Sequence, residues 1–288
     1  MQKIVLHPCA KINLGLNVVA RRADGYHDLE TVFYPIPLCD RLEVKTAERS
    51  NVSEPQINLS VSGNKIDGNT EDNLVVRAFR LIASRHNVES CDVLLDKQIP
   101  TQAGLGGGSS DAASMILALN KLNNLKLTDR QMQDYAAQLG ADCAFFITSQ
   151  PVYATGIGNV FEDVKITDEL SEKWMAIVKP PVAVSTKEAY SGIKPQPAAY
   201  NCLHAVASPM ASWREKLTND FEETILKIHP EIGKIKESLY GQGAIFSQMS
   251  GSGSAVYALF DNKPTDLNQP QYENCFISVF PLTKVINM

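Results

Sequence analysis

A run of glycines constrains this chain more than any other part of its sequence. Four of the five residues from Gly104 to Gly108 are glycine. Without Cβ atoms, such a segment can bring its backbone N–H groups close to a ligand and can adopt positive φ freely. Apolar residues then recur at helical spacing from Ala112 to Leu122, which predicts a helix that begins directly after the loop. The candidates for the N-cap of this helix are Ser109, Ser110 and Asp111.

A glycine-rich loop that opens a helix is typical of an anion-binding site, because unpaired N–H groups and the positive end of the helix dipole converge there. The Walker pattern requires a lysine directly after its last glycine, and none follows Gly108. The dinucleotide-binding fingerprint also fits poorly. Two interpretations stay open at this point, a phosphate cradle and a flexible connector. The combination of Pro100, the glycines, paired serines and a helix favours the cradle.

Length and composition bound the class of protein. The chain has 288 residues, of which 44% are hydrophobic and 20% charged, as in a globular protein with one large domain or two ordinary ones. No run of about 18 apolar residues is present, so no membrane span is expected. Residues 1–8 resemble neither a signal peptide nor a transit peptide, and a cytoplasmic location is expected. A net charge of −5 without a basic cluster argues against nucleic acid as the main partner.

The cysteines are spread along the chain. Six are present, with no C-x-x-C pair among them, which suits neither a zinc site nor a disulfide framework. We expect buried free thiols. The six positions are Cys9, Cys39, Cys91, Cys143, Cys202 and Cys275.

Periodicity predicts strands before helices in the first half of the chain. A helix over 73–82 should begin at an Asn cap, and Thr128 and Gln131 form a capping box for a further helix that should end before Gly140. An exposed loop is expected over 48–55. Strands are expected at 3–6, 9–19, 29–35, 41–46, 56–62 and 91–97.

The second half alternates between strands and helices. Residues 152–164 predict a hairpin, Ser185 or Thr186 should cap a short helix that carries Tyr190, and Pro230 should interrupt two helices over 220–240. Strands are expected at 174–179, 244–249, 255–260 and 276–281. This pattern predicts an α+β protein whose second domain is a ferredoxin-like split βαβ. The expected domains are residues 1–164 and 165–288.

Three groups of polar residues leave alternatives open. Lys11, Asn13 and Asn17 alternate with apolar residues along one strand, so they form either a solvated face or part of a site. Asp142 is either a helix N-cap or an active carboxylate. Tyr26 and His27 follow an Asp-Gly turn, and only the company of other site residues would give the histidine a function.

Three stretches, in this order, resemble the motifs of the GHMP small-molecule kinases. They are Pro8–Leu14, Pro100–Ala113 and Met249–Ser254. Two more, Arg21–Leu29 and Leu139–Asp142, resemble one branch of that family, and together the five stretches span essentially the whole chain. The resemblance implies a two-domain GHMP kinase fold, with an N-terminal domain like domain 2 of ribosomal protein S5 and a ferredoxin-like C-terminal domain.

The resemblance also implies a reaction. This branch uses ATP to phosphorylate the 2-hydroxyl of a methylerythritol that carries a cytidine diphosphate, in the non-mevalonate route to isoprenoid precursors. Magnesium is expected with ATP, although no pattern in the sequence identifies its ligands. The expected partners are therefore small molecules, with no nucleic acid and no membrane, and the chain is a monomer or a homodimer.

Each matching position carries an implied role. Asp142 is the general base, and Lys11 stabilises charge beside it. Asn13 holds the substrate near its hydroxyl, and Tyr26, His27 and Tyr190 recognise the cytosine ring. Gly251, Ser252 and Gly253 lie over the diphosphate or the methylerythritol. The ATP phosphates are bound by Pro100, Thr101, Gln102, Ala103, Gly104, Leu105, Gly106, Gly107, Gly108, Ser109 and Ser110. The family usually has glycine where this chain has Gln102.

Two rival functions remain. The first is a sister GHMP kinase that acts on homoserine, mevalonate or a related alcohol, although such substrates carry no base for Tyr26, His27 and Tyr190 to bind. The second is a regulator of the same fold that binds a nucleotide without catalysis, which the presence of Lys11 and Asp142 disfavours.

Overall fold

Strands come first along the chain and mix with helices later, and this content confirms the α+β class. The structure is a computed structural model that describes residues 1–47, 54–66 and 68–282. Of the loop expected over 48–55, residues 48–53 lie outside the described part of the chain.

The chain divides into two units that are not consecutive in sequence. The first unit holds residues 1–10, 38–101 and 106–150, and the second holds residues 11–37, 102–105 and 151–288. The boundary that we expect between residues 164 and 165 separates two domains that are consecutive in sequence. This boundary stays a prediction.

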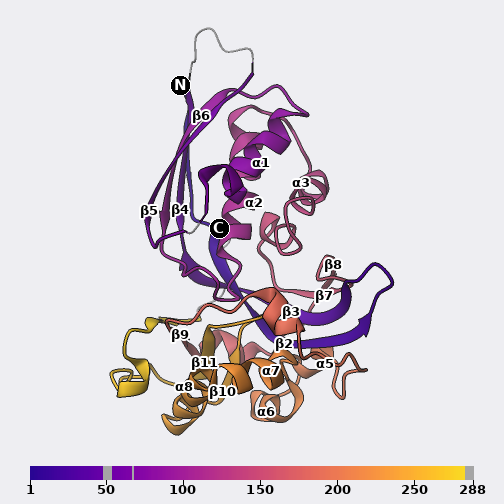
Figure 1. The fold of residues 1–288 in the computed structure, drawn as a ribbon, viewed down its shortest axis with the longest axis vertical. Coiled ribbons are helices and arrows are strands. Elements are labelled where there is room, and N and C mark those ends of the chain that lie inside the picture. Colours follow the sequence, from indigo (N-terminus) through magenta and orange to yellow (C-terminus); the bar gives the residue numbers. More distant parts are fainter. Residues whose placement is uncertain (48–53, 67, 283–288) are drawn as a thin grey trace. The chain divides into compact units, whose positions relative to one another are not determined.

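The first unit is built on one sheet (Figure 1). Its order is β1-β4-β6-β5, in which β1 and β6 run antiparallel to β4 while β5 runs parallel to β6. The helices of this unit cover one face of the sheet in Figure 1, and their buried residues include Val76, Phe79 and Ile116. The strands are β1 (Lys3–Leu6), β4 (Arg41–Ala47), β5 (Ile57–Gly63) and β6 (Ser90–Lys97).

Helix ends in the first unit are set by local side chains. Asn73 accepts a 2.9 Å hydrogen bond from the Val75 N–H and begins α1, as predicted. The capping box of Thr128 and Gln131 is also confirmed. The predicted role of Gly140 is wrong, because that helix ends at Ala136 with Ala137 as its C-cap. The helices are η1 (Thr70–Asp72), α1 (Leu74–Ala83), α2 (Gly107–Leu122), α3 (Asp129–Ala136) and η2 (Phe145–Ile147).

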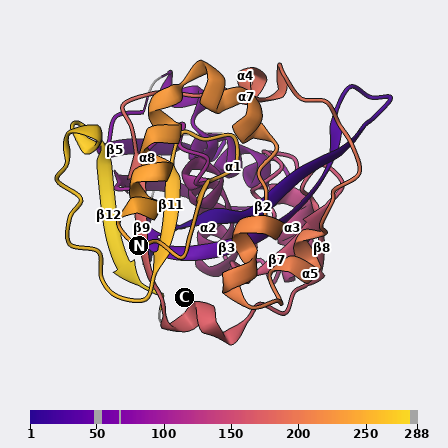
Figure 2. The same ribbon diagram turned by 90° about the horizontal axis from the view of Figure 1, so that it is seen from below.

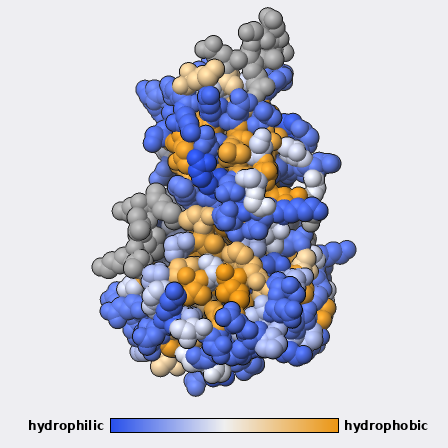
Figure 3. Space-filling model, turned by 90° about the vertical axis from the view of Figure 1, so that its left-hand side faces the viewer, coloured by the Kyte–Doolittle hydropathy of each residue, from blue (hydrophilic) through white to orange (hydrophobic). Residues whose placement is uncertain are grey.

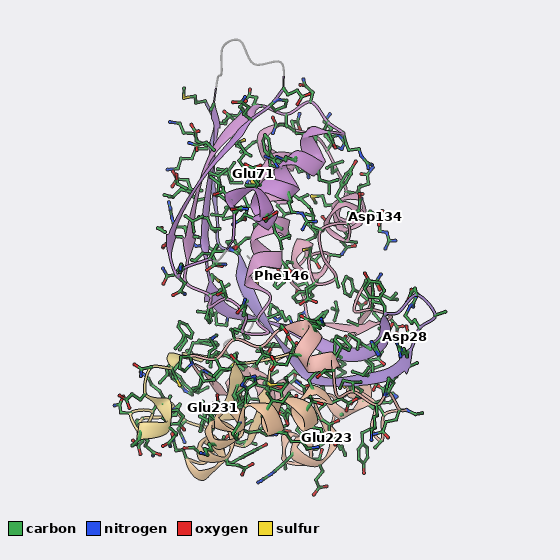
Figure 4. The ribbon with its side chains drawn as sticks, in the orientation of Figure 1. Asp28, Glu71, Asp134, Phe146, Glu223 and Glu231 are labelled. Atoms are coloured by element: carbon green, nitrogen blue, oxygen red, sulfur yellow. The ribbon has the colours of Figure 1, made fainter. Side chains whose placement is uncertain are left out.

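The first sheet of the second unit has the strand order β2-β3-β7-β8. Its first two strands, β2 and β3, are joined by a tight turn. The predicted Asp-Gly turn is confirmed, with Gly25 at φ 88° and a 2.8 Å hydrogen bond from the Arg22 N–H to the Tyr26 carbonyl. Figure 4 labels Asp28 beside this turn. The strands are β2 (Cys9–Arg21), β3 (His27–Cys39), β7 (Val152–Thr155) and β8 (Val160–Asp163).

The second sheet of this unit has the order β10-β11-β9-β12, and its strands are antiparallel. Numbered within this part of the chain, the order is 2-3-1-4, which is the ferredoxin-like arrangement that the sequence predicts. Helices α7 and α8 pack on this sheet through Ile225, Ile235 and Leu239, and Figure 2 shows α8 lying along β11. The elements are β9 (Trp174–Lys179), α7 (Phe221–Ile228), α8 (Pro230–Gly241), β10 (Phe246–Met249), β11 (Val256–Phe260) and β12 (Phe276–Pro281).

Short helices fill the connections. Ser185 caps the expected short helix α4 (Thr186–Tyr190), because its hydroxyl accepts from the Glu188 N–H at 3.1 Å. The two helices predicted on either side of Pro230 are confirmed, and Pro230 itself is the first residue of the second one, α8. The remaining short helices are too brief to show a period in the sequence. They are η3 (Asp168–Glu172), α5 (Cys202–Ala205), η4 (Met210–Ser212), α6 (Trp213–Lys216) and η5 (Pro270–Tyr272).

The face of the molecule shown in Figure 3 mixes hydrophobic and hydrophilic side chains. Leu94 and Val61, both in the sheet of the first unit, are 41% and 43% exposed. No helix in the described part of the chain has both the length and the apolar character needed to cross a bilayer. All six cysteines are free thiols, as predicted, with Cys39 and Cys275 half-buried and the others buried.

Candidate active site

Strand β2 carries two buried polar side chains that point into a hydrogen-bonded network. Lys11 and Asn13 are 3% and 2% exposed, so the interpretation of a solvated face is wrong. The Lys11 ammonium donates to Asn13 Oδ1 at 2.6 Å and lies 5.0 Å from the centre of the Phe33 ring. The Asn13 amide donates in turn to the Thr31 hydroxyl at 2.9 Å. A buried ammonium held this way is pre-oriented to meet negative charge.

Asn17, further along β2, belongs to a separate network around the buried carboxylate of Glu30. This carboxylate accepts from the amides of Asn17 and Asn201 at 2.7 and 2.9 Å, and from the Tyr153 hydroxyl at 3.0 Å. The donors come from three distant parts of the sequence. The residues that bury the polar face of β2 therefore cannot be predicted from the sequence of β2 alone.

Two glycine-rich segments meet in the second unit. These are residues 102–105 of the predicted phosphate loop, defined as Pro100–Ser110, and the Gly-Ser loop, defined as Ser250–Ser254. A Cβ atom at Gly104 would lie 1.9 Å from the Ser250 carbonyl oxygen, so no larger residue fits there. The Ser250 hydroxyl donates to the Gly104 carbonyl at 3.0 Å.

Both segments also touch β2. The Lys11 N–H donates to the Leu105 carbonyl at 2.9 Å. A Cβ atom at Gly251 would lie 3.3 Å from Asn13 Oδ1, which shows how closely that backbone approaches the asparagine. The second unit thus brings together parts of all three stretches that resemble the kinase motifs, including the predicted substrate residues Asn13 and Gly251. Ser252 and Gly253 lie in the same loop.

Gln102 occupies a position that suits glycine. Its φ is 50°, in the left-handed region that costs an L-residue about 1–2 kcal/mol. This conformation explains physically why a glycine at this position would fit the loop well. Gln102 is also exposed, so its side chain has room.

The rest of the phosphate loop belongs to the first unit and opens α2. Gly106, at φ 73°, is the N-cap, and the helix begins at Gly107. The prediction of Ser109, Ser110 or Asp111 as N-cap is therefore wrong, since all three lie inside the first turns of the helix. The helix starts within the glycines because Gly106 can adopt a left-handed conformation without steric cost. The N–H groups of the first turn are the ones that an anion would accept from.

A buried ion cluster, which was not predicted from the sequence, lies beneath this helix start. The Lys97 ammonium donates to Asp40 Oδ2 and, at 2.7 Å, to Asp111 Oδ2. The three side chains are 0–3% exposed. A Cβ atom at Gly107 would lie 3.3 Å from the Lys97 ammonium nitrogen. The cluster therefore fixes the place where the phosphate loop becomes a helix.

Charges within the cluster perturb each other. Burial raises the pKa of Asp111 to about 7, because Lys97 only partly offsets it and Asp40 adds to it. Burial acts to lower the pKa of Lys97, but the charges of Asp111 and Asp40 more than offset this, and the net shift is upward. Asp111 Oδ1 is buried and has no hydrogen-bond partner in the described structure. A signal in the sequence was available, because Lys97 follows Val93 and Leu95 at alternate positions and therefore falls on the apolar face of the strand.

Asp142 lies in a turn of the first unit, half-buried, between α3 and η2. It is not a helix N-cap, because η2 begins at Phe145 with Ala144 as its N-cap, so the capping interpretation is wrong. The next residue ties this turn to α2. Burial raises the pKa of the Cys143 thiol to about 11, with a hydrogen bond to the Ser109 side chain opposing the shift and the Asp142 charge adding to it. Within this unit the predicted base therefore lies near the end of the predicted phosphate loop. Figure 4 labels Phe146 in the adjoining helix η2.

A polar cavity of about 280 Å³ lies in the first unit and includes Asn64, Asn69 and Asn73 in its lining. Leu74, the residue after Asn73, lies 3.7 Å from where a Cβ atom of Gly108 would be. The cavity is therefore beside the start of α2. Of these three asparagines, only Asn73 was singled out in the sequence, and only as a helix cap, because single asparagines in loops carry no distinctive pattern.

Two of the three aromatic residues predicted to bind a base are in contact. The rings of His27 and Tyr190 are stacked, with centroids 4.8 Å apart and planes inclined by 23°. The rings of Tyr190 and Phe221 also make a T-shaped contact. Tyr26 projects into solvent and is 62% exposed. The second unit therefore presents an aromatic platform with an exposed tyrosine beside it in sequence.

The described residues contain no group of three or more His, Cys, Asp or Glu side chains arranged to hold a metal ion. Magnesium in ATP sites is held largely by the phosphates and by one or two carboxylates, so a dedicated cluster is not required.

Comparison with known proteins places these features in a family. The model of the GHMP kinases N terminal domain matches residues 73–150, and that of the GHMP kinases C terminal domain matches residues 201–268. The two domains are thus those of GHMP kinases. A 4-diphosphocytidyl-2-C-methyl-D-erythritol kinase from Bacteroides thetaiotaomicron is 46% identical over 262 residues, which cover 91% of this chain and 94% of that protein.

Solved structures agree. The crystal structure of a 4-(cytidine 5'-diphospho)-2C-methyl-D-erythritol kinase has a TM-score of 0.71 and 31% identity, and the match covers 89% of this chain and 90% of that one. A homoserine kinase from Cytophaga hutchinsonii shares the fold, with a TM-score of 0.66, 15% identity and coverage of 97% and 94%. The chain belongs to the 4-diphosphocytidyl-2-C-methyl-D-erythritol kinase family of GHMP kinases.

Proposed function

We propose that this chain transfers the γ-phosphoryl group of ATP to the 2-hydroxyl of 4-diphosphocytidyl-2-C-methyl-D-erythritol. The observation that carries the proposal is the assembly in the second unit, where Lys11, Asn13, Gly104 and Gly251 converge on one another. Phosphoryl transfer asks a protein mainly for positioning and for stabilisation of charge. A buried ammonium beside close-packed glycine backbone supplies both.

ATP is held by the phosphate loop in this proposal. The N–H groups at the start of α2 bind the phosphates together with the positive end of the helix dipole. The cavity beside Gly108 takes the nucleoside part of ATP, because its amide side chains can pair with the edge of a base. Mg²⁺ accompanies the nucleotide and neutralises phosphate charge.

The transfer step uses Asp142 and Lys11. The Asp142 carboxylate accepts the proton of the substrate hydroxyl as its oxygen attacks the γ-phosphorus, and the bond to the β,γ-bridging oxygen breaks to release ADP. The Lys11 ammonium stabilises negative charge on the reacting oxygens. Asn13 orients the lysine through its 2.6 Å hydrogen bond.

Recognition of the cytosine ring falls to Tyr26, His27 and Tyr190. The platform of His27 and Tyr190 offers a flat surface, and the exposed Tyr26 ring can close on the other face of a base. Hydrogen bonds to the pairing edge of cytosine would reject uracil strongly. Kinases for homoserine or mevalonate need no such platform, which disfavours them as alternatives.

The test is ADP release by the purified chain with ATP, Mg²⁺ and one alcohol at a time. Turnover should be high with 4-diphosphocytidyl-2-C-methyl-D-erythritol and near background with homoserine or mevalonate. The Lys11→Met variant serves as the control for contaminating kinases. Equal turnover with all three alcohols would refute the specificity, and ATP binding without turnover on any alcohol would support a regulatory function instead.

A further inference from the structure

A short segment that leads into the first turn of α7 joins β2 to the Gly-Ser loop. This clamp segment, Thr218–Glu222, runs beside β2 and forms an isolated parallel bridge between Asn219 and Leu16. The Leu16 N–H donates to the Thr218 carbonyl at 2.7 Å, and the Asp220 N–H donates to the Leu16 carbonyl at 2.9 Å. The strand that carries Lys11 and Asn13 is therefore held along this edge by backbone hydrogen bonds.

Side chains of the clamp segment extend the connection. Asp220 Oδ2 accepts from the Val18 N–H at 2.7 Å. Glu222 Oε1 accepts from the Met249 N–H at 2.8 Å, and its other oxygen accepts from the Lys236 ammonium at 2.6 Å. Figure 4 labels the neighbouring Glu223 on α7. The clamp thus bonds to β2 on one side and to the entry of the Gly-Ser loop on the other.

Asn219 is the centre of this arrangement. Its side-chain NH₂ donates to the Met249 carbonyl at 2.8 Å and to the Gly251 carbonyl at 2.9 Å, and its oxygen accepts from the Phe221 N–H at 3.1 Å. The residue is 4% exposed. A side-chain amide that donates both of its hydrogens to two carbonyls of one loop fixes the conformation of that loop, since a buried carbonyl without a hydrogen bond is destabilising.

The loop that Asn219 holds packs directly against Asn13, which orients the proposed catalytic residue Lys11. The Gly251 backbone lies against the Asn13 side chain, and Asn13 Oδ1 in turn accepts from the Lys11 ammonium. We infer that Asn219 is a positioning residue for phosphoryl transfer, which sets the place of the Lys11 ammonium through the backbone of Gly251 and the side chain of Asn13. This inference rests on the proposed function.

Geometry of this kind acts on the chemical step more than on binding. A small displacement of a catalytic group lowers kcat strongly, because the group no longer meets the charge that develops in the transition state. ATP binding at the start of α2 involves other residues. Loss of Asn219 should therefore lower kcat while the KM for ATP changes little.

The first experiment compares Asn219→Ala with a matched control, Asn120→Ala. Asn120 makes the same kind of bridge, donating to the Leu127 carbonyl at 3.1 Å and accepting from the Leu127 N–H at 3.0 Å, in the first unit. With 4-diphosphocytidyl-2-C-methyl-D-erythritol and ATP, we expect kcat to fall about tenfold or more in Asn219→Ala, which corresponds to about 1.4 kcal/mol. Asn120→Ala should keep the wild-type kcat despite a similar loss of thermal stability.

The second experiment uses the Asn219→Asp variant, which has nearly the same shape. Its carboxylate would face two carbonyl oxygens, so kcat at pH 8 should be lower than in Asn219→Ala. The missing donors and the burial should raise the pKa of the new carboxyl. On protonation it regains one O–H donor, so activity relative to wild type should rise as the pH falls from 8 to 6. A purely structural role predicts no such recovery.

Glu222 provides a test that does not depend on the folding of Asn219 variants. Glu222→Gln retains an acceptor for the Met249 N–H and should keep most of kcat, whereas Glu222→Ala should lose it. A wild-type chain that releases no ADP with this substrate would refute the proposed function itself. An active wild type whose kcat survives Asn219→Ala, or both Glu222 substitutions, would overturn the inference about the clamp segment.

Discussion

Removal of the Lys97 ammonium should destabilise the first unit severely. The Lys97→Met change would keep most of the volume of the side chain but leave the Asp40 and Asp111 carboxylates in a site where both are 3% exposed or less. Breaking a buried ion pair by deleting one partner costs about 3–5 kcal/mol, because the remaining charge stays buried and uncompensated. Here two carboxylates would remain, although Asp40 Oδ1 keeps its hydrogen bonds from the Gln98 and Ile99 N–H groups.

Asp111→Asn should have the opposite effect. The cluster holds one cation and two carboxylates, so removing the Asp111 charge leaves a neutral pair of Lys97 and Asp40. At pH 8 we expect the variant to be as stable as wild type or more stable by about 1–3 kcal/mol. The stability of Asp111→Asn relative to wild type should depend on pH. Because burial raises the pKa of Asp111 from 3.8 to about 7, ionisation of this group reduces stability as the pH rises through that window.

The assay is urea unfolding at pH 4.5 and pH 8, followed by far-UV circular dichroism. Both tryptophans, Trp174 and Trp213, belong to the second unit, so their fluorescence reports separately on that unit and is the internal control. The difference between Asp111→Asn and wild type should be larger at pH 8 than at pH 4.5. A Lys97→Met chain as stable as wild type at pH 8, or an Asp111→Asn chain destabilised there, would refute the reasoning.

Three further predictions concern the site. Asp142→Asn should keep its affinity for ATP while kcat falls by about two or more orders of magnitude, as for loss of a general base; isothermal titration and ADP release measure the two, and unchanged turnover would remove the assigned role. Tyr26→Ala should mainly raise the KM for the cytidine substrate, and steady-state kinetics with a normal KM would exclude a contact with the base. Gln102→Val should lower the free energy of unfolding by about 1–2 kcal/mol, because a β-branched residue tolerates the left-handed region poorly. Gln102→Gly should change the free energy of unfolding by less than about 0.5 kcal/mol, since relief of strain offsets the added entropy of the unfolded chain. Equal urea midpoints for the Gln102→Val variant and wild type would contradict this prediction.

Elements with strong local signals were predictable from the sequence. The Asn73 cap of α1, the capping box of Thr128 and Gln131 and the turn at Gly25 all follow from side chains within a few residues. The strand order of the second sheet also followed, because alternating strands and helices leave few arrangements.

Features that depend on distant partners were missed. Lys97 and Asp40 are 57 positions apart, and the side-chain amide of Asn219 donates to the Gly251 carbonyl, 32 positions away. Periodicity left open whether the polar residues of β2 are solvated, because the side chains that bury them, such as Tyr153 and Asn201 around Glu30, lie far along the chain. Periodicity reports which face of a strand is polar, but it does not report what covers that face.

The start of α2 shows a different limit. Ser109, Ser110 and Asp111 are preferred cap types, yet the helix begins earlier because Gly106 adopts the left-handed conformation that ends the loop. Asp111 is then drawn inward to the Lys97 ammonium. The preference of these residues for the N-cap position is therefore not met, and Asp111 pairs with Lys97 inside the protein instead.

The chemical structure of the product tests the proposed phosphoryl transfer most directly. The chain is incubated with ATP, Mg²⁺ and 4-diphosphocytidyl-2-C-methyl-D-erythritol, beside the Asp142→Asn variant, and the product is followed by ³¹P NMR. The proposed mechanism predicts a new phosphomonoester on the 2-hydroxyl carbon in the wild type, formed at least about a hundredfold more slowly by the variant. A phosphate at any other hydroxyl, or none at all, would contradict it.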